Sequence, residues 1–80
     1  MAKNGLFVVT GAGSGIGAAI AKALLDQGFY VFGLGRTTSK LAAVKNLNPE
    51  HFDFLACDLK RADECERAVS AVKARLLTLG

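Results

Sequence analysis

The chain is poor in the residues on which several common kinds of site depend. Its 80 residues include one histidine, one proline, two cysteines and no tryptophan. Cys57 and Cys65 form no Cys-x-x-Cys pair, and no group of histidines accompanies them. We therefore expect no metal site, and two reduced thiols in a cytoplasmic protein. We expect the single histidine, His51, to lie in a solvated loop after Pro49.

Charge is also sparse, and its distribution excludes several partners. The net charge of +3 comes from scattered residues, of which only Lys60 and Arg61 are adjacent basic neighbours. No basic stripe is present, so we expect no nucleic-acid partner. Residues 5–21 carry no charge, but five glycines interrupt them, so we expect no membrane span and no signal peptide. With 51% hydrophobic residues, the composition is that of one small globular domain over residues 1–80.

The most informative segment is the glycine-rich stretch at residues 10–17, Thr-Gly-Ala-Gly-Ser-Gly-Ile-Gly. The apolar residues 6–9 before it predict a buried strand, and apolar residues recur at helical spacing after it. A helix begins with unpaired N–H groups and the positive end of its dipole, and glycines let a phosphate approach both. The segment therefore predicts a phosphate-binding turn. It is not the P-loop of ATPases, because Ala18 and Ala19 follow Gly17 where that loop needs lysine and a hydroxyl.

The rest of the chain alternates predicted strands and helices. Gly28 stands where the first helix should end, and residues 30–34 predict a second strand. A short second helix ends at Asn48-Pro49, a third strand covers residues 52–57, and Asp63-x-x-Glu66 predicts a capping box for the last helix. The β-α-β-α-β-α order predicts an α/β fold. We expect one half of a three-layer, doubly wound Rossmann-type parallel sheet, with strand order 3-2-1 and the first strand at an exposed edge.

Three features of the chain resemble the short-chain dehydrogenase/reductase family. The first is the spacing Thr10-Gly11-x-x-x-Gly15-x-Gly17 on the first strand-to-helix turn. The second is Arg36 at the end of the second strand, and the third is Cys57-Asp58-Leu59 at the end of the third. The resemblance covers nearly the whole chain. It implies a Rossmann-type domain that binds NAD(H) or NADP(H).

The resemblance also implies roles for the residues of the glycine turn. Gly11 makes the sharp turn out of the strand, Gly15 admits the pyrophosphate, and Gly17 lets the helix pack on the sheet. Ser14 and Ile16 contribute backbone N–H groups to the pyrophosphate. Each of two glycines at a helix start lowers the stability of the helix by roughly 1 kcal/mol relative to alanine. The close approach of a ligand or a strand would explain why glycine stands at both positions.

We expect residues at the ends of the second and third strands to bind the adenosine of the cofactor. An acidic residue that binds the ribose 2′-hydroxyl of NAD is normally found about 20 residues after the glycine turn. Here that place holds Gly35-Arg36, and Arg36 would attract a 2′-phosphate, so we expect NADP(H) rather than NAD(H). The hydroxyl of Thr37 either assists or caps the next helix. The resemblance implies that Asp58 accepts from the adenine amino group and that Leu59 donates its N–H to the ring, although Asp58 can instead cap the last helix.

The resemblance implies an oxidoreductase, but the chain lacks the family's catalytic residues. The family uses a Tyr-x-x-x-Lys pair and a serine, whereas the only tyrosine, Tyr30, is followed four residues later by Leu34. We therefore expect the NADP(H)-binding portion of an enzyme that reduces carbonyls or oxidises alcohols, inactive as an isolated chain. The alternative is a non-catalytic nucleotide-binding or assembly module. The exposed first strand predicts self-association, and hence a homo-oligomer, in either case.

Overall fold

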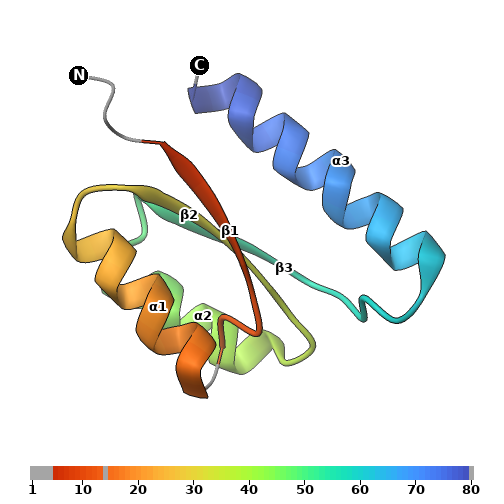
Figure 1. Cartoon of the computed structure of the whole chain (residues 1–80), viewed down its shortest axis with the longest axis horizontal. Coiled ribbons are helices and arrows are strands. Elements are labelled where there is room, and N and C mark those ends of the chain that lie inside the picture. Colours follow the sequence, from red (N-terminus) through yellow and green to blue (C-terminus); the bar gives the residue numbers. More distant parts are fainter. Residues whose placement is uncertain (1–4, 14, 80) are drawn as a thin grey trace.

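A computed structural model describes residues 5–13 and 15–79 of the chain. The elements alternate in the order β1 (Leu6–Thr10), α1 (Gly15–Asp26), β2 (Tyr30–Gly35), α2 (Thr38–Leu47), β3 (Phe52–Ala56) and α3 (Ala62–Leu79). Figure 1 shows three layers, with α1 and α2 on one face of the sheet and α3 on the other. The predicted three-layer α/β half-fold is therefore confirmed.

The three strands form one parallel sheet with β2 in the middle. In β1, Leu6 is aligned with Tyr30 of β2, and in β3, Phe52 is aligned with Val31 of β2. The predicted order 3-2-1 is correct, because β1 and β3 are the outer strands. All three strands run the same way, so their carboxyl ends meet at one edge of the sheet.

Alternation along β2 sorts the apolar side chains into two small cores. Val31 contributes to the core beneath α1 and α2, which also contains Leu25, Leu41 and Phe52. Phe32 and Leu34 point to the opposite face and pack with Cys57 and Ala68 beneath α3. Because successive side chains of a strand point to opposite faces, a run of buried residues in the central strand serves both cores.

The structure confirms the predicted end of the first helix and corrects the predicted start of the last one. Gly28 ends α1 with a φ of +89°, a left-handed conformation that favours glycine, as predicted. The capping box predicted for the last helix is wrong. Asp63 lies inside the first turn of α3, which begins at Ala62, and its carboxylate is 3.4 Å from Arg61 Nε. Asp63 therefore complements the helix dipole instead of capping the helix.

His51 is not the solvated loop residue that the sequence predicts. Its ring is half-buried and stacks on Tyr30, with 4.4 Å between the ring centroids. The guanidinium of Arg75, from α3, lies 5.8 Å from the centroid of the same tyrosine ring and donates to the carbonyl of Glu50 at 3.1 Å. The loop before β3 is thus packed against β2 through the stacked ring of His51 and against α3 through the hydrogen bond from Arg75.

The edge formed by β1 leaves apolar surface uncovered. Phe7 and Val8 of this strand are 42% and 47% exposed, and Val69 of α3 is 54% exposed. Val8, Val69 and their neighbours line an apolar groove of about 360 Å³ between β1 and α3. No helix among the described residues is long and apolar enough to cross a membrane.

Candidate nucleotide-binding site

A cleft of about 400 Å³ lies at the carboxyl ends of the three strands. In an open parallel sheet this edge is where ligands bind. The cleft brings together five of the residues that the sequence predicts for a cofactor: Gly11, Arg36, Thr37, Asp58 and Leu59. They come from the three loops that follow β1, β2 and β3, so the parallel sheet is what gathers residues far apart in the chain.

The glycine turn is tied to the central strand by backbone hydrogen bonds. The N–H groups of Gly11 and Ala12 both donate to the carbonyl of Leu34, at 2.7 and 3.3 Å. Gly11 has a φ of +68° and Gly15 a φ of +57°, values that residues with a side chain rarely adopt. The turn therefore depends on glycine at both positions for its backbone conformation.

Gly17 is required for a different reason. A Cβ at this position would collide with the carbonyl group of Gly11 and lie 3.1 Å from the carbonyl oxygen of Thr10. The first turn of α1 is thus packed directly on the end of β1. This geometry brings the positive end of the helix dipole close to the carboxyl end of the strand.

The remaining predicted residues of the turn lie outside the cleft lining. Gly15, Ile16 and Gly17 begin α1 beside it, and the Ile16 side chain is 80% exposed. Ser14 lies outside the described residues. The first N–H groups of α1 belong to this segment, which is the part of a helix that binds anions.

Arg36 and Thr37 occupy the loop between β2 and α2. The preceding residue, Gly35, is held in place because its carbonyl accepts from the N–H of Cys57 at 2.7 Å. Thr37 has the extended conformation of an N-cap, with φ −109° and ψ 105°, yet its hydroxyl makes no capping hydrogen bond within the described chain. The hydroxyl of Thr37 and the exposed guanidinium of Arg36 are therefore both available to a ligand in the cleft.

Asp58 is held by hydrogen bonds on both sides. Its Oδ1 accepts from the N–H of Lys60 at 3.0 Å, and its own N–H donates to Glu64 Oε1 at 2.8 Å. Its carbonyl accepts from the N–H of Arg61 at 3.1 Å. One carboxylate oxygen thus organises the turn before α3, but it bonds to no N–H of that helix, which begins at Ala62, so the predicted alternative of a helix cap at Asp58 is not what the described residues show. A carboxylate can accept further hydrogen bonds, so this role leaves acceptor capacity for a ligand in the cleft.

Sequence reasoning missed three charged residues of this region. Lys40 and Lys60 line the cleft with Arg36, and Glu64 holds the turn that contains Asp58. The position of Lys40 in the cleft depends on how α2 meets the glycine turn, a contact that the sequence does not signal. Glu64 has no signal in the sequence either, because its role depends on how α3 meets the end of β3.

Cys57 follows β3, lines the cleft and is a buried free thiol, while Cys65 is a half-buried free thiol. Burial, and after it the carboxylate of Glu64, raises the pKa of the Cys57 thiol above its ordinary value. The Sγ of Cys65 donates to the carbonyl of Leu59 at 3.1 Å. A thiol with a raised pKa stays protonated near neutral pH and is a poor nucleophile.

Comparison with known proteins adds independent evidence. The model of the short chain dehydrogenase family matches residues 6–80. The short chain dehydrogenase andC of Emericella variicolor is 42% identical over 64 residues, which are 80% of this chain and 24% of that protein. The chain thus spans about a quarter of the length of this relative.

Solved structures agree with this match. A short-chain dehydrogenase from Streptomyces avermitilis superimposes with a TM-score of 0.88 and 29% identity, over 95% of this chain and 28% of that one. An actinorhodin polyketide ketoreductase with NADPH gives a TM-score of 0.82 and 35% identity, over 90% of this chain and 29% of that one. The fold, the glycine turn and the match over residues 6–80 agree, and the chain belongs to the short-chain dehydrogenase/reductase family.

Proposed function

We propose that the chain is the NADP(H)-binding portion of a short-chain oxidoreductase that transfers hydride between the nicotinamide cofactor and a carbonyl or alcohol substrate. Residues 1–80 would form the amino-terminal dinucleotide-binding half of its Rossmann domain. The two free thiols support the cytoplasmic location that the sequence predicts, because the cytoplasm keeps thiols reduced. The proposed cofactor-binding residues are Gly11, Ser14, Gly15, Ile16, Gly17, Arg36, Thr37, Asp58 and Leu59.

The choice of NADP(H) rests on the carboxyl end of β2. Gly35 ends this strand and offers no carboxylate for a ribose 2′-hydroxyl, while Arg36 lines the cleft beside it. A charge-assisted hydrogen bond from Arg36 to a 2′-phosphate is worth about 1.5–3 kcal/mol, which is roughly a ten- to hundredfold preference. The NADPH complex of the related polyketide ketoreductase supports the same cofactor.

The other residues of the cleft would share the remaining parts of the dinucleotide. The glycine turn and the first N–H groups of α1 would hold the pyrophosphate. Asp58 and the backbone of Leu59 would hold the adenine. The cofactor, when bound, supplies or accepts the hydride. The residues of this chain bind and orient it.

We expect the groups that act on the substrate to lie in a part of the enzyme outside residues 1–80. Residues 1–80 contain no Tyr-x-x-x-Lys pair, and Tyr30 is stacked on His51 at the amino end of the sheet, opposite to the cleft. Residues 1–80 alone should therefore bind the cofactor without transferring hydride. The small-molecule substrate would be bound by that further chain as well.

The proposal is tested by titrating the chain with NADPH and NADH at equal concentrations, read by nucleotide fluorescence and by thermal stability. Arg36→Ala should weaken NADPH binding ten- to hundredfold and leave NADH binding unchanged. Lys22→Ala, an exposed cation on α1, is the control and should change neither. Failure of the unaltered chain to bind either nucleotide would contradict the proposal, as would a preference for NADH.

A second candidate function is assembly through β1. The strand is an uncharged edge with exposed Phe7 and Val8, so it can pair with another chain. In this alternative the chain is a non-catalytic nucleotide-binding module that forms homo-oligomers. A stable, defined oligomer of residues 1–80 would favour it.

A further inference from the structure

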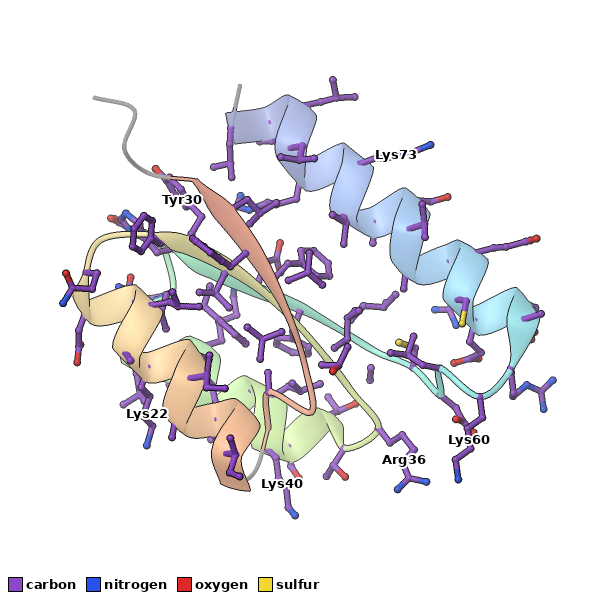
Figure 2. The ribbon with its side chains drawn as sticks, viewed as in Figure 1. Lys22, Tyr30, Arg36, Lys40, Lys60 and Lys73 are labelled. Atoms are coloured by element: carbon purple, nitrogen blue, oxygen red, sulfur yellow. The ribbon has the colours of Figure 1, made fainter. Side chains whose placement is uncertain are left out.

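Three cationic side chains line the cleft, and each comes from a different segment. Arg36 follows β2, Lys40 lies in the first turn of α2, and Lys60 follows β3. Figure 2 shows all three projecting from the end of the molecule where the strands terminate, whereas Lys73 lies far away on α3. The ion pairs found within residues 5–13 and 15–79 involve other basic side chains. The cleft thus carries more positive charge than Arg36 alone provides.

Lys40 is placed at the cleft by its contact with the glycine turn. A Cβ at Gly13 would lie 2.9 Å from Lys40 Cβ and 3.4 Å from the backbone nitrogen of Leu41. Distances this short show that the turn and the first turn of α2 touch, which a side chain at Gly13 would prevent. Lys40 therefore lies against the glycine turn and lines the same cleft as Arg36.

The local stability of α2 does not explain a lysine at this position. Lys40 lies in the first turn of the helix, and this turn contains no acidic residue. The positive end of the helix dipole repels a cation there and attracts an anion. An anion bound in the cleft would offset that repulsion, because it would lie against both the dipole and the ammonium group.

We propose that Lys40 is a specificity-determining residue that binds, together with Arg36, a phosphomonoester on the 2′ position of adenosine. This inference rests on the proposed function. A phosphomonoester carries about −1.5 to −2 charges near neutral pH, so a single guanidinium leaves part of that charge unpaired. Lys40 supplies a second, mobile point charge, whereas the uncharged 2′-hydroxyl of NAD(H) gains nothing from it.

The test compares the dissociation constants of NADPH and NADH for the unaltered chain and for Lys40→Met, which keeps the aliphatic stem and removes the charge. We expect NADPH to bind about tenfold more weakly to this variant, with NADH unchanged. Lys40→Arg restores the charge and should recover most of the NADPH affinity. Lys73→Met, the same substitution on the opposite face of the sheet, should change neither constant.

The possible outcomes separate this inference from the proposed function. If the unaltered chain prefers NADPH and Lys40→Met leaves that preference intact, the role of Lys40 is wrong and the proposed function stands. Equal weakening of NADPH and NADH would also overturn the inference, because it would assign Lys40 to the pyrophosphate. An unaltered chain that binds neither nucleotide overturns both.

Discussion

The N–H of Asp58 donates to Glu64 Oε1 over 2.8 Å, so a carboxylate in the first turn of α3 holds the turn that follows β3. The two residues lie on opposite sides of the connection between strand and helix. This hydrogen bond fixes the backbone that presents Asp58 and Leu59 to the cleft. Glu64 is therefore a positioning residue, which acts through the turn and not by touching a ligand.

Replacing Glu64 tests this arrangement. Glu64→Ala leaves the half-buried N–H of Asp58 without its acceptor, and the free energy of unfolding should fall by about 1–2 kcal/mol. Glu64→Gln keeps an acceptor oxygen and should lose less. Urea unfolding measures both, with Glu66→Ala, an exposed residue of the same helix, as the control. A loss in Glu66→Ala as large as that in Glu64→Ala would contradict the prediction.

Gly15 and Gly17 should respond to alanine for different reasons. Gly17→Ala places a methyl group against the Gly11 carbonyl group, and this overpacking should cost about 1–3 kcal/mol of stability. At Gly15 the methyl group meets open space, but the φ of +57° is strained for alanine, which should cost about 1 kcal/mol. Thermal and urea unfolding of both variants measure the two costs.

The two glycine variants can also be told apart structurally. Gly17→Ala should shift the amide signals of residues at the end of β1, because the helix must move away from the strand. Gly15→Ala should confine its shifts to the start of α1. If Gly17→Ala is as stable as the unaltered chain, the close packing of α1 on the end of β1 is wrong.

The proposed preference for NADP(H) over NAD(H) should be reversible by substitution at Gly35. Its backbone is outside the left-handed region, and the atoms nearest to a Cβ there belong to the Leu41 side chain, at ordinary contact distances of 3.6, 3.7 and 3.9 Å. Gly35→Asp should accept a hydrogen bond from a ribose 2′-hydroxyl and repel a 2′-phosphate. The ratio of NADPH to NADH affinity should fall at least about tenfold, measured by fluorescence titration. Gly35→Asn has the same shape without the charge, and an equal fall in this variant would contradict the electrostatic explanation.

Self-association through β1 should be sensitive to charge on that strand. Val8→Lys places a cation on the exposed edge, which disfavours pairing with another strand. Sedimentation velocity over a wide concentration range should show larger species for the unaltered chain and a monomer for the variant. Leu47→Lys, at an apolar position of α2 that is 62% exposed, should leave association unchanged. If the unaltered chain is a monomer at every concentration, the prediction of self-association is wrong.

The raised pKa of the Cys57 thiol predicts a loss of stability at alkaline pH. Burial raises this pKa most, followed by the charge of Glu64, so the folded chain keeps the proton after the unfolded chain has released it. Stability contributed by this group is therefore complete below about pH 9 and is lost as the pH rises above that value. Above pH 9, the midpoint temperature of thermal unfolding should fall less steeply with pH in Cys57→Ala than in the unaltered chain. Equal slopes for the two proteins would contradict the prediction.

The elements of the fold could be predicted because local patterns determine them. The apolar run of β2 predicts a central strand, and Gly28 and Asn48 mark where the helices end. The start of α3 was predicted incorrectly, because Asp63 suits both the cap and the first turn of a helix. His51 was misplaced because its burial depends on Tyr30, which is distant in the sequence.

The candidate site could be predicted where its residues stand at the carboxyl ends of predicted strands. Gly11 and Arg36 stand at positions fixed by strand ends, and the structure places both in the cleft. Lys40 and Glu64 depend on contacts between elements, namely α2 against the glycine turn and α3 against the end of β3. Such contacts have no period in the sequence, so a single chain does not reveal them.

The position of α3 on the face opposite to α1 and α2 determines where a further parallel strand can join the sheet (Figure 1). Crossovers between parallel strands are right-handed in nearly all proteins, so helices on the first face carry the chain from β1 towards β3. A helix on the second face must lead back the other way. Any parallel strand that follows α3 in this sheet will therefore lie beside β1. The direction of winding then reverses at the glycine turn, and a ligand can enter the crevice that opens there.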